Sequence, residues 1–167
     1  KRKFPQVTVA VDKSRKEGCM FLTNPELLQT SKKAARCLYK DMPKADIIVL
    51  DDAFQHRHVK AGLNILLIDS NRPVWRDNVM PFGRLRESIG GISRADIVIF
   101  TKCKGVTAEQ KSAYRSYIKE IKDIPVYFTA IRYGKPYPLF NSANTAMPQE
   151  SRVLLVTGIA NPQPLKA

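Results

Sequence analysis

A short apolar run that ends in two adjacent carboxylates constrains the fold of this chain more than any other feature. Residues 47–50 read Ile-Ile-Val-Leu, a composition typical of a strand buried on both faces of a parallel sheet. Asp51 and Asp52 follow at the carboxyl end of this predicted strand, where ligands of open α/β sheets collect. The pattern is that of a Walker B strand, whose carboxylate helps to hold a nucleotide-bound magnesium ion. An Asp that only caps a turn is the simpler alternative.

Other segments along the chain predict the rest of the architecture. A helix is expected from Asn24, with Pro25 in its first turn, to about Tyr39. Thr107 and Gln110 have the spacing of a capping box, and the helix that they open would turn an apolar stripe toward the core: Tyr114, Tyr117, Ile118 and Ile121. Further strands are predicted at 7–11, 63–69, 97–100, 124–129 and 153–158. We therefore expect an α/β fold with a mainly parallel sheet and flanking helices.

Two connections in this scheme leave the topology open. About a dozen residues separate Asp52 from the next predicted strand, which is short for the crossover that a parallel neighbour needs. Gly90 and Gly91 are expected to interrupt any short helix that follows Arg86.

Two motifs resemble those of the tetraacyldisaccharide 4'-kinase family, the kinases of lipid A synthesis. The first, residues 51–57 (Asp-Asp-Ala-Phe-Gln-His-Arg), is similar to the family's DDGFQHR signature, with Ala53 in place of the usual Gly. The second, residues 81–87 (Pro-Phe-Gly-Arg-Leu-Arg-Glu), is similar to the family pattern P-x-G-x-L-R-E. A strand-like run at 94–102 follows, as in the family, and the resemblance extends from about Val7 to Pro162.

The resemblance implies transfer of the γ-phosphoryl group of ATP to the 4'-hydroxyl of a tetraacylated glucosamine disaccharide 1-phosphate. It implies ATP and Mg²⁺ as cofactors, with Asp51, Asp52 and Glu87 at the metal. Arg86 corresponds to an arginine that steadies the phosphoryl group in transfer, a role suited to a permanently charged planar side chain. Substrate contacts are expected from Gln55, His56 and Arg57, whereas His58 is expected to be structural.

The sequence lacks the loop that a P-loop kinase uses to hold phosphates, since no G-x-x-x-x-G-K-[ST] run occurs. The family's Gly-Asp-Glu-Pro motif is absent too. We therefore expect an incomplete, P-loop NTPase-like piece of a longer kinase, inactive by itself. Residues 1–132 would be the central part of the kinase core and 133–150 a linker. Residues 151–167 would begin a carboxy-terminal strand and helix.

The net charge of +13 is unevenly distributed, at +7 over residues 1–45, zero over 46–101 and +6 over 102–167. Basic flanks attract phosphates of any kind. Together with the resemblance, they indicate a lipid A precursor and an anionic inner-membrane surface as partners, with the protein peripheral on the cytoplasmic face. No apolar run approaches the roughly 18 residues of a membrane span.

Alternative classes of protein remain open at this point. A different P-loop phosphotransferase or ATPase would share the strand and the Asp-Asp pair. A nucleic-acid-binding domain is suggested by charge alone, and we expect no nucleic acid because no such motif occurs. Residues 101–104 (Thr-Lys-Cys-Lys) lack the Asn and Asp of a GTPase base-reading motif. Cys19, Cys37 and Cys103 match neither a zinc site nor a disulfide framework, which favours a reducing compartment.

Overall fold

The computed structural model describes residues 4–36, 42–132 and 134. The chain divides into two units, Lys1–Ile131 and Arg132–Ala167, and the elements described here belong to the first. The predicted end of the first helix near Tyr39, the linker at 133–150 and the strand at 153–158 lie outside the described residues.

Three strands, three α-helices and three 3₁₀ helices occur in the described residues. In chain order they are α1 (Arg15–Thr23), α2 (Glu26–Gln29), η1 (Lys32–Arg36), β1 (Ile65–Asp69), η2 (Val74–Arg76), η3 (Ile89–Arg94), β2 (Ile97–Thr101), α3 (Ala108–Ile121) and β3 (Val126–Phe128).

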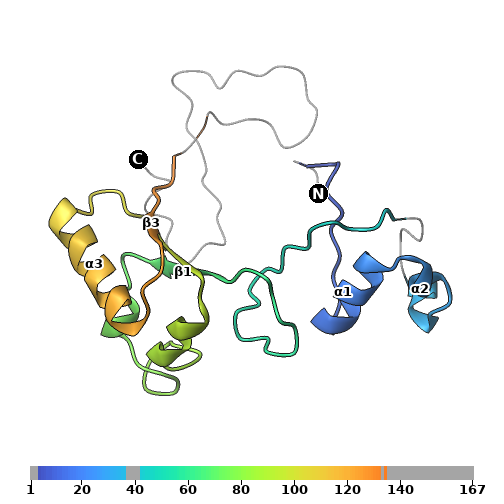
Figure 1. The fold of residues 1–167 in the computed structure, drawn as a ribbon, viewed down its shortest axis with the longest axis horizontal. Coiled ribbons are helices and arrows are strands. Elements are labelled where there is room, and N and C mark those ends of the chain that lie inside the picture. The colour runs from blue at the N-terminus through green and yellow to red at the C-terminus, as the bar shows by residue number, and fades with distance from the viewer. Residues whose placement is uncertain (1–3, 37–41, 133, 135–167) are drawn as a thin grey trace, which may run out of the picture. The chain divides into compact units, whose positions relative to one another are not determined.

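The strands form a parallel sheet in the order β1-β2-β3 (Figure 1). Ile68 of β1 lies beside Phe100 of β2, which in turn lies beside Phe128 of β3. The α/β class with a parallel sheet is confirmed, as are the strands predicted at 63–69, 97–100 and 124–129. The first and last are shorter than predicted, and β2 extends one residue further, to Thr101.

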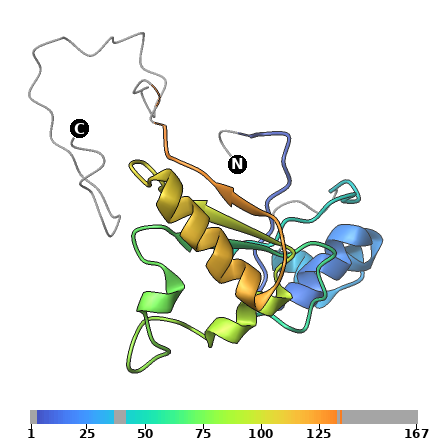
Figure 2. The same cartoon turned by 60° about the vertical axis from the view of Figure 1, so that its left-hand side comes forward.

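Helix α3 begins at the predicted capping box and lies across the sheet (Figure 2). The Thr107 hydroxyl accepts from the Gln110 amide at 3.3 Å, and the Gln110 side chain accepts from the Thr107 amide at 2.9 Å. Ile118 is fully buried, and Tyr114 packs against the same core, which confirms the apolar stripe. The helix connects β2 to β3, as a parallel crossover requires.

The core lies between α3 and one face of the sheet. Alternate residues of β2, Val98 and Phe100, are fully buried, because successive side chains of a strand point to opposite faces. Trp75 of η2 packs on α3, with its ring centroid 4.3 Å from Tyr117 and 5.1 Å from Tyr114. This aromatic contact holds the connection between β1 and β2 against the helix.

The strands predicted at 7–11 and 47–50 are not formed, and this is the main correction to the sequence analysis. Both segments are irregular, and their apolar side chains are exposed: Val11 by 98%, Ile47 by 83% and Val49 by 88%. A strand needs a hydrogen-bonding neighbour, and in the described residues β1 pairs with β2 alone. A parallel neighbour of β1 would need a crossover, and no helix lies between Asp52 and β1 to provide one. The short connection after Asp52 therefore agrees with the absence of a strand at 47–50.

The helix predicted from Asn24 is also wrong in extent. Helix α2 covers only Glu26–Gln29 and is followed by η1, because the Ser31 hydroxyl accepts from the Lys33 amide and competes with helical bonding. Helix α1 was not predicted, although Ser14 caps it by accepting from the Glu17 amide at 3.3 Å. Gly90 and Gly91 do not interrupt a helix but lie within η3.

Candidate functional site

The first motif forms a series of turns in which Asp52 has a left-handed backbone. Its φ is +48°, a conformation that Asp tolerates better than most residues. Ala53 has no positive φ, so alanine fits where the family usually has glycine. The His56 amide donates to the Ala53 carbonyl at 2.8 Å and closes the next turn.

Phe54 attaches this motif to the core of the sheet. Its half-buried ring packs against the buried cluster, and the Arg94 guanidinium lies 4.7 Å from the ring centroid. Arg94 also donates to the Phe54 carbonyl, with an N–O distance of 3.4 Å. A cation over an aromatic ring is attracted by the electron-rich face, so this contact helps to fix the loop that follows Asp52.

An ion pair joins the two motifs. One guanidinium nitrogen of Arg86, Nη1, lies 2.8 Å from each carboxylate oxygen of Asp52. These hydrogen bonds, with the positive charge of Arg86, hold the pKa of Asp52 below its usual value. Asp52 is therefore ionised at neutral pH and close to a permanent cation. Both side chains are exposed, so a ligand can reach them.

Glu87 lies between two other arginines. Its Oε1 accepts from Arg94 at 2.5 Å, and its Oε2 is 3.6 Å from Arg57 of the first motif. The carboxylate lies against Gly91, where a Cβ atom would come within 2.8 Å of Glu87 Cδ. Gly91 is buried, so the absence of a side chain there provides the space that Glu87 occupies.

The structure brings only part of the predicted set together. Asp52 contacts Arg86, and Arg57 contacts Glu87, but each carboxylate faces arginines and not the other carboxylate. The side chains of Asp51, Gln55 and His56 are exposed and make no hydrogen bond or ion pair with another described residue. No group of three or more His, Cys, Asp or Glu side chains suited to a metal occurs in the described ranges.

The donor set is nevertheless compatible with magnesium. Asp51 and Asp52 are adjacent and exposed, and they offer hard carboxylate oxygens. Magnesium keeps several waters and needs only one or two protein carboxylates, particularly when phosphates supply further oxygens.

Sequence reasoning missed Arg94 and Gly91 as parts of this site. Both precede β2, and the only signal for them was their place in or beside the family-like run 94–102.

A further ion pair lies at the carboxyl ends of the strands, where Lys102 donates to Asp69 at 2.5 Å. Burial works to raise the pKa of Asp69, but hydrogen bonds from Lys102 and the Asn71 amide outweigh it and lower the pKa.

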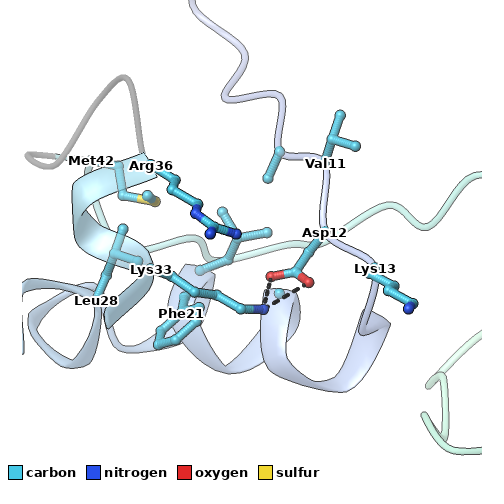
Figure 3. A pocket seen from close by; sticks show the side chains of 11 residues that line it. Val11, Asp12, Lys13, Phe21, Leu28, Lys33, Arg36 and Met42 are labelled. Carbon is cyan, nitrogen blue, oxygen red and sulfur yellow. Dashed lines mark hydrogen bonds and ion pairs between the residues drawn. The ribbon is translucent and has the colours of Figure 1, made fainter. Parts of the chain in front are cut away.

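A cavity of about 270 Å³ lies among α1, α2, η1 and the segment before α1 (Figure 3). Buried Phe21 and Leu28 form part of its apolar wall. Asp12 accepts from Lys33 at 3.0 Å, and the Arg36 guanidinium points into the cavity. No residue of either motif lines it, so we do not assign it to the candidate site.

Fold and site together define an α/β protein with a parallel sheet whose exposed carboxylates and arginines are suited to phosphate chemistry. A family model described as tetraacyldisaccharide-1-P 4'-kinase (LpxK) matches residues 1–167. The chain belongs to this family, as the two motifs predicted.

Curated relatives agree with the family match. The chain is 39% identical to a tetraacyldisaccharide 4'-kinase of Phocaeicola vulgatus, over 99% of this chain and 43% of the relative. It is 40% identical to the protein of that name from Bacteroides thetaiotaomicron, over 98% and 42%, and 36% identical to that of Flavobacterium johnsoniae, over 98% and 44%. The chain thus spans less than half of the length of these relatives. No solved structure matches it.

Proposed function

We propose that the full-length protein carrying this chain transfers the γ-phosphoryl group of ATP to the 4'-hydroxyl of a tetraacylated glucosamine disaccharide 1-phosphate. The family match over all 167 residues is the observation that carries this proposal. The contacts between the two motifs, Asp52 with Arg86 and Arg57 with Glu87, support it, because they gather charged groups from both at one place.

The resemblance to the family implies the roles of the residues, and their charges are compatible with these roles. Asp51 and Asp52 would hold Mg²⁺, with Glu87 close by, and the bound ion would neutralise charge that develops during transfer. Arg86 would move from the Asp52 carboxylate to the phosphoryl group when substrates bind, since a guanidinium forms charge-assisted hydrogen bonds with both kinds of anion. Gln55, His56 and Arg57 would contact the sugar or its phosphate, and their exposed side chains are accessible to it.

The fold of the whole enzyme would be P-loop NTPase-like. The phosphate-holding loop is not among these 167 residues, so the chain would contribute the central part of the core over residues 1–132. Residues 133–150 would be a linker, and 151–167 would begin the carboxy-terminal part. This division predicts that the 167-residue chain alone transfers no phosphoryl group.

We place the enzyme peripherally on the cytoplasmic face of the inner membrane. None of the helices in the described residues has the length and apolarity that a membrane crossing requires. The basic flanks, at +7 and +6, could draw the protein to anionic lipid, near an acyl-anchored substrate.

Phosphoryl transfer by the full-length enzyme tests the proposal. We expect the wild-type protein to phosphorylate the acceptor with ATP. Asp52→Asn and Arg86→Gln should each lower kcat by about 100-fold or more, because both groups would act on charge that develops in transfer. Arg84→Gln is the matched control, since Arg84 belongs to the same motif and its exposed side chain makes no hydrogen bond or ion pair with another described residue. A wild-type enzyme that consumes ATP without phosphorylating the acceptor would instead indicate another phosphotransferase or an ATPase.

A further inference from the structure

A second cavity, of about 230 Å³, lies beside the first motif and has a wholly basic and neutral lining. Residues 13–16, at the start of α1, line one side of it, and His56, His58 and Val59 line the other. Lys13, Arg15 and Lys16 therefore stand around one space together with two histidines, and no acidic side chain lines it.

The cations of this cavity have few partners of their own. The side chains of Lys13 and Lys16 make no hydrogen bond or ion pair with another described residue. Arg15 donates from Nη1 to the Asp12 carbonyl, a neutral partner, at 3.1 Å. Cations held close together repel one another, and an anion in the cavity would relieve that repulsion.

The cavity is also close to the candidate site. Arg86 is the main cause of the lowered pKa of Asp52, and the charges of His56 and Arg15 add to the effect. Two lining residues of the cavity therefore act on the carboxylate that is assigned to the metal. A ligand in the cavity would lie next to the groups that would carry out phosphoryl transfer.

We propose that this cavity binds a phosphate group of a substrate, with Lys13, Arg15 and Lys16 as its cationic ligands and His56 and His58 beside them. A phosphate dianion accepts hydrogen bonds and donates none, whereas lysine and arginine side chains donate hydrogen bonds and accept none. The volume of about 230 Å³ is several times the roughly 30 Å³ that one water occupies, so the cavity has room for a phosphate group. The end of α1 is not the basis of the site, because Ser14 already caps it.

The choice of the molecule that supplies the phosphate group rests on the proposed function. The reaction offers two phosphate-bearing molecules, the 1-phosphate of the acceptor and the phosphates of the nucleotide. The cavity's position beside Gln55, His56 and Arg57, the expected sugar contacts, favours the acceptor. His58, which the sequence analysis left as structural, would then be part of substrate binding.

The test compares Lys13→Gln/Lys16→Gln with Lys104→Gln/Lys119→Gln in the full-length enzyme. The second pair removes the same charge from exposed positions that no described site uses. Glucosamine 1-phosphate binding is measured by calorimetry, with glucosamine as the ligand lacking phosphate. We expect the Kd of the phosphate ester to rise about tenfold or more in the first variant only, from the loss of two charge-assisted contacts. Glucosamine binding should be the same in both variants.

Kinetics of the same variants identify the source of the phosphate. A higher KM for the acceptor at unchanged kcat and unchanged KM for ATP would establish the acceptor's 1-phosphate as the ligand. A higher KM for ATP alone would keep the phosphate site but assign it to the nucleotide. Equal Kd and KM values in the two variants would overturn the site even if the enzyme is an active kinase. Wild-type protein that binds the ester but transfers no phosphoryl group would refute the proposed function and leave the site standing.

Discussion

Arg94 donates to Glu87 at 2.5 Å while its guanidinium lies over the ring of Phe54. One side chain thus links the Arg-Glu motif to the loop of the Asp-Asp motif, 40 residues earlier in the chain. Because Phe54 packs on the core of the sheet, this link ties the position of a candidate catalytic carboxylate to the fold itself.

Gly91→Ala should displace Glu87 with little effect on stability. The added methyl would lie 2.8 Å from Glu87 Cδ, so the carboxylate must leave its place against η3. In the full-length enzyme we expect kcat to fall about tenfold, a 1.4 kcal/mol effect, while the melting temperature changes little. Gly90→Ala is the matched control, because the nearest atom to its methyl is Ser88 Oγ at 3.8 Å. Equal rates for the two variants would argue against a role for the Glu87 position.

Ile118→Ala should strongly destabilise the chain, whereas Ile47→Ala should not. Ile118 is fully buried between α3 and the sheet, and truncation of such a residue costs about 2–5 kcal/mol. Ile47 is 83% exposed, so its truncation should change the free energy of unfolding by less than about 0.5 kcal/mol. Urea unfolding of both variants measures the difference. A large loss for Ile47→Ala would mean that the 47–50 segment is a buried strand after all.

Acid should remove the contribution of Asp69 to stability. Its pKa is lowered in the folded state, so the stabilisation is present above the unfolded value of about 3.9 and is lost as the pH falls through the folded value. At pH 7 we expect Asp69→Asn to lower the unfolding free energy by about 1 kcal/mol, a modest figure because the Lys102 partner is about half exposed. Urea unfolding should show this difference at pH 7 and its disappearance near pH 2. A difference independent of pH would contradict the mechanism.

Binding of the full-length enzyme to vesicles should depend on anionic lipid. Each Lys or Arg close to such a surface contributes about 1 kcal/mol, and the effect decays over a Debye length of about 10 Å at 0.1 M salt. Co-sedimentation should therefore be strong with anionic vesicles at low salt and weak at high salt. Equal binding to neutral vesicles would exclude an electrostatic attachment.

The sequence by itself determined the family of this protein and the local elements from β1 to β3 that form the sheet and its covering helix. Alternation in β2 and the capping box of α3 depend on residues within a few positions of one another, so their patterns can be read directly. The two motifs likewise identified the family, which the comparison confirmed. The roles of the individual site residues remain predictions.

Only the tertiary structure decided which of these parts meet. The run at 47–50 has the composition of a strand, yet pairing requires a neighbour that composition does not supply. The contacts of Arg86 with Asp52 and of Arg94 with Phe54 span 34 and 40 residues. Such contacts depend on how the sheet and η3 place distant loops, and a local sequence pattern does not predict that placement. The left-handed backbone lies at Asp52 and not at position 53, where the family usually has glycine, because the turn is set by the contacts of the folded loop.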